Sequence, residues 1–153
     1  MSEWSKWLNR LFIEEFKDQF EWPGVYKIRL ADSRGDPIEI GRLLDKDKDG
    51  TLAIGETESI ARRISEFYMA YEEGGAVHSE GETLSLIQVK TKFRRGTYDD
   101  CKIQFAARKL NDKAEAEKEE ERLLKSYFIK YGELPPLNRK LPDSRLGWDN
   151  LNA

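Results

Sequence analysis

The sequence predicts a single small α+β domain in which a short antiparallel sheet is flanked by helices. Three observations predict this fold class. The 153 residues, 39% of them hydrophobic, suffice for one core, and the lone Cys101 rules out a disulfide within the chain. Alternating apolar residues at 25–30, 51–54 and 102–106 are typical of half-buried strands. Apolar residues recur at helical spacing in 2–20, 58–71 and 112–131.

Residues 2–20 are expected to form one amphipathic helix with Ser2 as its N-cap. The apolar stripe is rich in aromatic residues: Trp4, Trp7, Leu8, Leu11, Phe12, Phe16 and Phe20. We expect this N-terminal segment (residues 1–22) to pack on the domain. A homodimer formed through the aromatic stripe is the alternative.

Residues 23–138 are expected to form the main domain. Pro23-Gly24 opens a strand at 25–30, and a second short strand follows at 38–40. The strand at 51–54 leads into a helix at 58–71, which Gly74-Gly75 ends. The segment 83–93 suits a strand and a helix equally well.

The last predicted strand, residues 102–106, precedes a long helix. Asn111 or Asp112 caps this helix, which runs to Tyr131 and ends at Gly132. Residues 139–153 are expected to be an irregular C-terminal tail.

Composition excludes several classes of protein. The 26 basic and 29 acidic residues leave a net charge of −3, which is unlike a polycationic nucleic-acid-packaging protein. One histidine and one cysteine exclude a Cys/His zinc site. The sequence has no export signal and no apolar segment of membrane-spanning length, so we expect a cytoplasmic protein without a membrane partner.

Residues 45–56 match the spacing of a calcium-binding loop. Asp45, Asp47, Asp49 and Glu56 stand at ligand positions, and Gly50 stands at the turn. The preceding residues contain a proline and a glycine and make a poor entering helix. We therefore favour a hairpin loop and do not expect Ca²⁺ binding.

Four short patterns follow one another along residues 23–138. Pro23-Gly24-Val25-Tyr26 lies on the first strand, and Ala53-Ile54-Gly55-Glu56-Thr57 ends a later one. Arg63 follows on a helix, and the segment 123–138 closes with Asn138. In this order and on these elements, the patterns resemble the GIY-YIG nuclease superfamily, including its restriction endonucleases with an enlarged first hairpin.

The resemblance implies a hydrolase that cleaves phosphodiesters with Mg²⁺ or Mn²⁺. It assigns catalytic roles to Tyr26, Arg63 and Asn138, with Arg63 neutralising the phosphate. Ala53 departs from the pattern, because the family has a tyrosine there.

Two further departures concern the helices. Phe67 stands where the family has a tyrosine or histidine, so the adjacent Tyr68 is the candidate catalytic residue. Lys125 stands where a metal-binding glutamate is expected, which makes Glu121, one turn earlier, the candidate ligand. These departures leave open whether the domain is an active endonuclease or an inactive nucleic-acid or protein interaction module on the same scaffold.

A nucleic-acid surface is expected from clustered basic residues: Arg62, Lys90, Lys92, Arg94 and Arg95. DNA is the expected partner, with RNA as the alternative. His78 is interpreted as a surface loop residue, with a catalytic role as the minor alternative.

Overall fold

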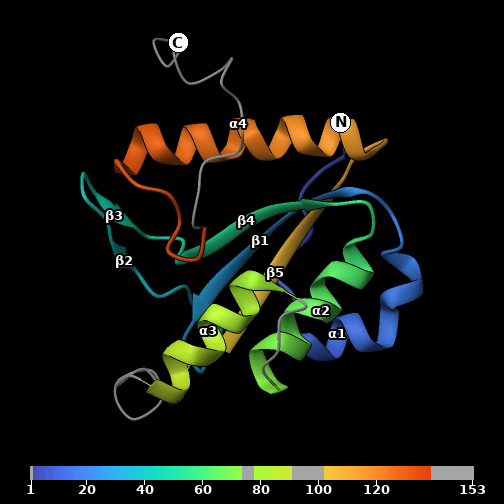
Figure 1. Ribbon diagram of the computed structural model, residues 1–153, viewed down its shortest axis with the longest axis horizontal. Coiled ribbons are helices and arrows are strands. Elements are labelled where there is room, and N and C mark those ends of the chain that lie inside the picture. The colour runs from blue at the N-terminus through green and yellow to red at the C-terminus, as the bar shows by residue number, and fades with distance from the viewer. Residues whose placement is uncertain (1, 74–77, 91–101, 139–153) are drawn as a thin grey trace.

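The computed structural model describes residues 2–73, 78–90 and 102–138 (Figure 1). The elements, in chain order, are α1 (Arg10–Phe16), the 3₁₀ helix η1 (Lys17–Gln19), β1 (Gly24–Ala31), β2 (Ile40–Gly41), β3 (Lys46–Asp47), β4 (Thr51–Thr57), α2 (Ile60–Glu73), α3 (Ser79–Lys90), β5 (Lys102–Lys109) and α4 (Lys113–Tyr131). Helices combined with a small antiparallel sheet confirm the predicted α+β fold class.

The main sheet has three strands in the order β4-β1-β5, and both pairings are antiparallel. In the central strand, Tyr26 lies opposite Gly55 of β4 and Ala107 of β5. The short β2–β3 pair forms a second sheet within the enlarged hairpin between β1 and β4. Since β4 has a sheet neighbour on one side only, other parts of the chain must cover its free edge.

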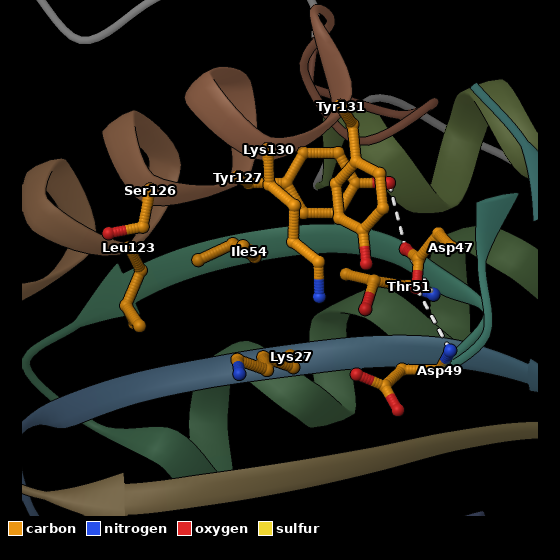
Figure 2. A pocket seen from close by; sticks show the side chains of 10 residues that line it. All are labelled: Lys27, Asp47, Asp49, Thr51, Ile54, Leu123, Ser126, Tyr127, Lys130 and Tyr131. Atoms are coloured by element: carbon orange, nitrogen blue, oxygen red, sulfur yellow. Dashed lines mark hydrogen bonds between the residues drawn. The ribbon is translucent and has the colours of Figure 1, made fainter. Parts of the chain in front are cut away.

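Helix α4 covers one face of the sheet (Figure 1). Ile54 of β4 packs there against Leu124, Tyr127 and Tyr131. Figure 2 shows Ile54 with the two tyrosines. The helix begins at Asp112, whose carboxylate accepts a hydrogen bond from the Glu115 N–H, and it ends at Gly132 in the left-handed conformation. These bounds confirm the predicted long helix.

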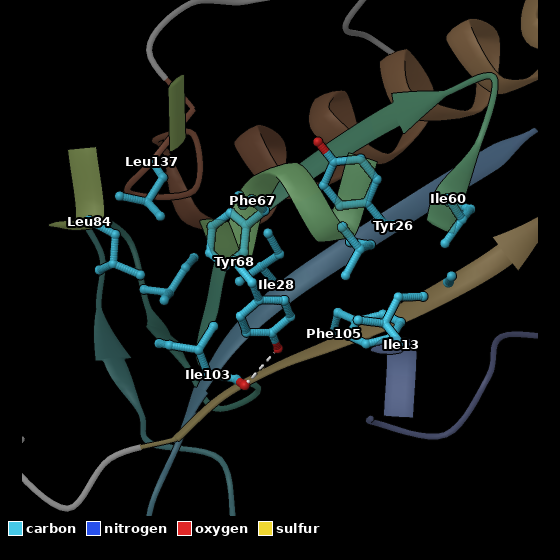
Figure 3. Close-up of a cluster of buried hydrophobic side chains, with 14 of the residues drawn as sticks. Ile13, Tyr26, Ile28, Ile60, Phe67, Tyr68, Leu84, Ile103, Phe105 and Leu137 are labelled. Carbon is cyan, nitrogen blue, oxygen red and sulfur yellow. Dashed lines mark hydrogen bonds between the residues drawn. The ribbon is translucent and has the colours of Figure 1, made fainter. Parts of the chain in front are cut away.

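The opposite face carries the larger core, between the sheet and α1, α2 and α3 (Figure 3). Alternate residues of β1 (Tyr26, Ile28 and Leu30) point into it, as period-two alternation requires. Ile64 and Phe67 of α2 are fully buried against them. Each such side chain contributes about 1.5–3 kcal/mol through burial of its apolar surface.

The N-terminal segment differs from the prediction. The helix begins at Arg10, capped by Asn9, instead of at Ser2. Residues before it run extended along β5, with a backbone hydrogen bond from the Ser5 N–H to Ala107 and a bridge between Leu8 and Phe105. The main-chain donors and acceptors at the edge of β5 thus outweigh the helical spacing of the aromatic residues.

The aromatic residues of this segment contact their own chain. Trp4 and Trp7 lie beneath the cationic groups of Lys27 and Arg29. Phe20 packs against Phe105 of the sheet. These contacts explain the aromatic stripe without a second copy of the chain.

The segment 83–93, which the sequence left open, is helical as far as the structure describes it, to Lys90 in α3. Leu84 of this helix is buried in the larger core. Residues 91–101 and the predicted tail at 139–153 lie outside the described residues.

Candidate active site at the edge of strand β4

Tyr26 is placed by β1 so that its ring crosses the neighbouring strand at Gly55. A Cβ atom on Gly55 would lie 2.3 Å from the Tyr26 hydroxyl oxygen and 2.4 Å from Cζ. Only a glycine therefore leaves room for the ring here. The ring crosses β4 at Gly55, on the face of the sheet that α2 and α3 cover. Figure 3 shows Tyr26 in this position.

Arg63 approaches the same hydroxyl group from α2. Its guanidinium interacts electrostatically with Tyr26 and donates a hydrogen bond to Glu66, 3.2 Å away. Because Arg63 is half-buried, its charge is screened less than that of a surface arginine. The structure therefore brings together the two sequence-predicted residues Tyr26 and Arg63.

His78 lies beside them, which corrects its interpretation as a surface residue. Its side chain is fully buried, and Nε2 lies 3.3 Å from the Tyr26 hydroxyl oxygen. The other ring nitrogen, Nδ1, lies 3.0 Å from the Glu80 carboxylate. Phe67 packs edge-on against the imidazole. No spacing in the sequence indicated this contact, since 52 residues separate Tyr26 from His78.

Glu120 faces this edge from α4. It stands one turn after the buried Ala116 and one turn before the buried Leu124, on the stripe that packs against the sheet. Its carboxyl group interacts electrostatically with Glu56 of β4. Burial and the neighbouring Glu56 carboxylate raise the pKa of Glu120 to about 7.

Glu56 is the second carboxyl group at this edge. Its Oε2 atom is buried and has no hydrogen-bond partner among the described residues. Burial raises the pKa of Glu56 as well. Two adjacent carboxyl groups, one with an unsatisfied oxygen, are suited to a cation, which would remove their mutual repulsion.

Glu121, the ligand predicted from sequence, points elsewhere. It forms an ion pair with Lys125 one turn along α4, with 2.7 Å between Nζ and Oε1. The acidic residue of α4 that interacts electrostatically with Tyr26 is Glu120. The sequence did contain a signal for Glu120, because this residue shares the helical spacing of the buried residues of α4: Ala116, Leu124, Tyr127 and Tyr131.

Tyr68 is not brought to this edge. Its side chain is buried in the larger core, and its hydroxyl group donates a hydrogen bond to the Ile103 carbonyl, 2.9 Å away. Ala53 is also buried in that core. Neither residue adds a polar group to the candidate site.

Asn138 supports the edge without contacting Tyr26 or Arg63 through any hydrogen bond in the described structure. Its Oδ1 accepts a hydrogen bond from the Ile54 N–H at 3.0 Å, and its Nδ2 donates one to the Ile54 carbonyl at 2.9 Å. The Leu137 N–H donates to the Leu52 carbonyl. Residues 137–138 therefore complete the free edge of β4 immediately before Gly55.

The predicted nucleic-acid surface is described only in part. Arg62 is exposed on α2, one residue before Arg63. Lys90 ends α3, and Lys92, Arg94 and Arg95 lie outside the described residues.

The calcium-like loop is folded as a hairpin turn. The Asp47 carboxylate is buried and accepts hydrogen bonds from the N–H groups of Asp49 and Thr51 and from the Tyr127 hydroxyl group. Glu56 stands five residues beyond Thr51 on an extended strand, about 16 Å further along. It therefore does not close the loop as a calcium ligand would.

A cavity of about 170 Å³ lies next to this turn, between β1, β4 and α4 (Figure 2). Lys27, Asp49, Thr51 and Lys130 line it, together with Tyr127 and Tyr131. The cavity does not include any of Tyr26, Arg63, His78 and Glu120.

Comparisons with protein-family models, with curated proteins and with solved structures find no match. In the part of the chain that the structure describes, no three His, Cys, Asp or Glu side chains gather into a metal-binding group. The described helices also include none that is long and apolar enough to span a membrane. Any assignment of function must therefore be argued from the side chains at the edge of β4.

Proposed function

We propose that this domain is a GIY-YIG-like endonuclease that cleaves DNA with a divalent metal ion. The observation that carries the proposal is the convergence of Tyr26 (β1), Arg63 (α2) and Glu120 (α4) beside Gly55. A phenol, a guanidinium and a carboxyl group from three separate elements interact electrostatically near Gly55, which leaves room for the tyrosine ring.

Each group suits one task in phosphodiester hydrolysis. The guanidinium of Arg63 matches the geometry and charge of a phosphate, whose negative charge increases in the transition state. The Tyr26 hydroxyl group is placed to orient the attacking water and to exchange a proton with it. A carboxyl group with a pKa of about 7 is readily deprotonated when a cation binds, and Glu120 meets this condition.

The residues present fit Mg²⁺ or Mn²⁺ with most of its ligands supplied by water and phosphate. Glu120 would hold the ion, with Glu56 adjacent. When bound, such an ion stabilises the negative charge on the phosphate and on the leaving oxygen. Magnesium commonly retains several waters and uses only one or two protein carboxylates, so a site with few protein ligands is chemically reasonable.

The test is a nicking assay on supercoiled, branched and single-stranded DNA with Mg²⁺ or Mn²⁺. We expect divalent-dependent nicking by the wild type and a loss of at least about 100-fold in Arg63→Ala and Glu120→Gln. Glu121→Gln is the matched control, because it removes a carboxylate from the next position of the same helix. It should nick at the wild-type rate.

Two results would contradict the proposal. The first is a wild type that nicks none of these substrates, and the second is full nicking by Arg63→Ala and Glu120→Gln. If the wild type binds DNA without nicking it, and Arg63→Ala weakens that binding, the alternative of an inactive nucleic-acid-binding module is supported. The burial of Tyr68 and Ala53 away from the site favours that alternative.

A further inference from the structure

His78 stands immediately before α3, and three neighbouring side chains hold its ring in one orientation. Glu80 lies 3.0 Å from Nδ1, Tyr26 lies 3.3 Å from Nε2, and Phe67 packs edge-on against the ring with centroids 5.3 Å apart. The imidazole side chain has no exposed surface. A buried ring fixed on both nitrogens has the geometry of a proton relay.

The partners of Nδ1 determine which nitrogen carries the proton. Burial alone would raise the pKa of Glu80, but hydrogen bonds from His78 and Ser79 help to hold it below its ordinary value, so Glu80 is an ionised acceptor at neutral pH. Two acceptors cannot form a hydrogen bond, and the contact of 3.0 Å therefore places a proton on Nδ1. The Gly81 N–H, 3.4 Å from the same nitrogen, could donate only to an unprotonated Nδ1, and this longer contact competes with the 3.0 Å contact to Glu80. Nε2 of the neutral ring then carries the lone pair that faces Tyr26.

The Tyr26 oxygen has complementary partners. Arg63 interacts electrostatically with it and has no acceptor atom, so the Tyr26 O–H is available to donate to His78 Nε2. Burial and the charge of Glu80 raise the pKa of Tyr26, with Arg63 opposing them and Glu120 adding to them. Tyr26 is therefore protonated at neutral pH and needs a proton acceptor before it can act as a base. Phe67, the α2 residue that packs against the imidazole, has no acceptor atom.

We propose that Glu80 and His78 form a proton relay for Tyr26. This proposal rests on the proposed endonuclease function. His78 Nε2 takes the hydroxyl proton of Tyr26 while the Tyr26 oxygen takes a proton from the attacking water. The water oxygen forms a bond to phosphorus, the bond to the leaving oxygen breaks, and that oxygen takes a proton from solvent. His78 afterwards returns its proton through Tyr26 to solvent, which restores the starting state.

The first test requires no catalysis. The chain contains one histidine, so ¹⁵N NMR of histidine-labelled protein reports on His78 alone. We expect the neutral ring to carry its proton on Nδ1, with a downfield Nδ1–H resonance that is lost in Glu80→Gln. A neutral ring protonated on Nε2 would overturn the relay, whatever the protein does to DNA.

The second test uses the nicking assay across a range of pH. His78→Gln should lower kcat by about 100-fold or more with little change in KM, as loss of a proton acceptor predicts. Glu80→Gln should lower kcat less and change its pH profile. Glu82→Gln is the matched control, because Glu82 is the other acidic residue in the first turn of α3. It should leave the rate and the profile unchanged.

The outcomes separate the two proposals. Nicking by His78→Gln at the wild-type rate overturns the relay and leaves the endonuclease proposal intact. A wild type that nicks no substrate overturns the endonuclease proposal and the catalytic role of the relay with it. Urea unfolding of each variant distinguishes a lost proton acceptor from a lost fold, and Glu80→Gln provides the test if His78→Gln does not fold.

Discussion

Two clusters of polar side chains lie against β4, and they differ in how completely their hydrogen bonds are satisfied. At the start of the strand, the buried Asp47 carboxylate accepts from three donors. Near its end, Glu56 has a buried oxygen without a partner among the described residues, and Glu120 has a pKa of about 7. The first cluster stabilises the hairpin, whereas the second holds a carboxyl group with an unsatisfied oxygen beside one whose pKa is raised.

Buried polar groups are usually satisfied, and exceptions concentrate at functional sites because a ligand completes them. The difference between the two clusters therefore supports a structural role for Asp47 and a binding role for the edge beside Gly55. The same difference predicts opposite effects of mutation. Removing a carboxylate should be costly at the first cluster and favourable at the second.

Asp47→Ala should have the largest effect on stability. It leaves the Tyr127 hydroxyl group and the N–H groups of Thr51 and Asp49 without their acceptor, and we expect a loss of about 3–5 kcal/mol. Urea unfolding measures this loss. Asp45→Ala is the control, since Asp45 is exposed and its carboxylate accepts a hydrogen bond from the adjacent Lys46 N–H. It should change stability by less than about 0.5 kcal/mol. A loss under about 1 kcal/mol for Asp47→Ala would remove the distinction between the clusters.

Gly55→Ala should disrupt the second cluster by steric overlap. The added Cβ would lie 2.3 Å from the Tyr26 hydroxyl oxygen, so the ring must move, at a cost of about 2–3 kcal/mol. The His78 imidazole resonances should shift as the contact with Tyr26 is lost. Gly41→Ala is the control, because a Cβ there meets nothing within 4 Å. Unchanged stability and unchanged His78 resonances in Gly55→Ala would contradict the placement of Tyr26.

The elements were largely predictable because their signals are local. The alternation at 25–30, the cap at Asp112 and the stop at Gly132 each act over a few residues, and the structure has a strand and a capped helix at these places. The N-terminal helix was predicted too long because the prediction used the spacing of its aromatic residues and did not consider pairing with β5. The unpaired edge of that strand, more than 90 residues further along the chain, holds residues 5–8 extended.

The candidate site was predicted less completely, since it depends on which side chains meet across the fold. Tyr26 and Arg63 were identified from motif order, and they do meet. His78 was missed because its contact with Tyr26 is set by the packing of α3 on α2. Glu121 was chosen in place of Glu120 because the motif alignment was given more weight than the buried stripe of α4, which the sequence already contained.

Glu120→Gln should make the protein more stable above neutral pH. The pKa of this carboxyl group in the folded protein, about 7, exceeds its ordinary value of 4.5, so wild-type stability is retained below about pH 4.5 and falls as the pH rises through 7. The variant lacks this fall, and at pH 8 we expect it to be about 2 kcal/mol more stable than the wild type. Urea unfolding from pH 5 to 8 measures the difference. The control Glu121→Gln should follow the wild-type pH dependence, and a parallel course for Glu120→Gln would show that Glu120 is solvated.

Asn138→Ala should have the smallest effect on stability. It also tests whether Asn138 positions strand β4 or takes part in the reaction itself. The variant loses two hydrogen bonds to the Ile54 backbone at an edge that water can partly reach, so we expect a loss of about 1 kcal/mol in urea unfolding. Asn111→Ala removes a hydrogen bond from an exposed asparagine and should cost less than about 0.5 kcal/mol. Because Asn138 fixes the strand next to Gly55, nicking by Asn138→Ala should fall by about 10-fold while the His78 resonances stay in place. A loss as large as that of Arg63→Ala, without any change in stability, would instead indicate that Asn138 contacts the substrate directly.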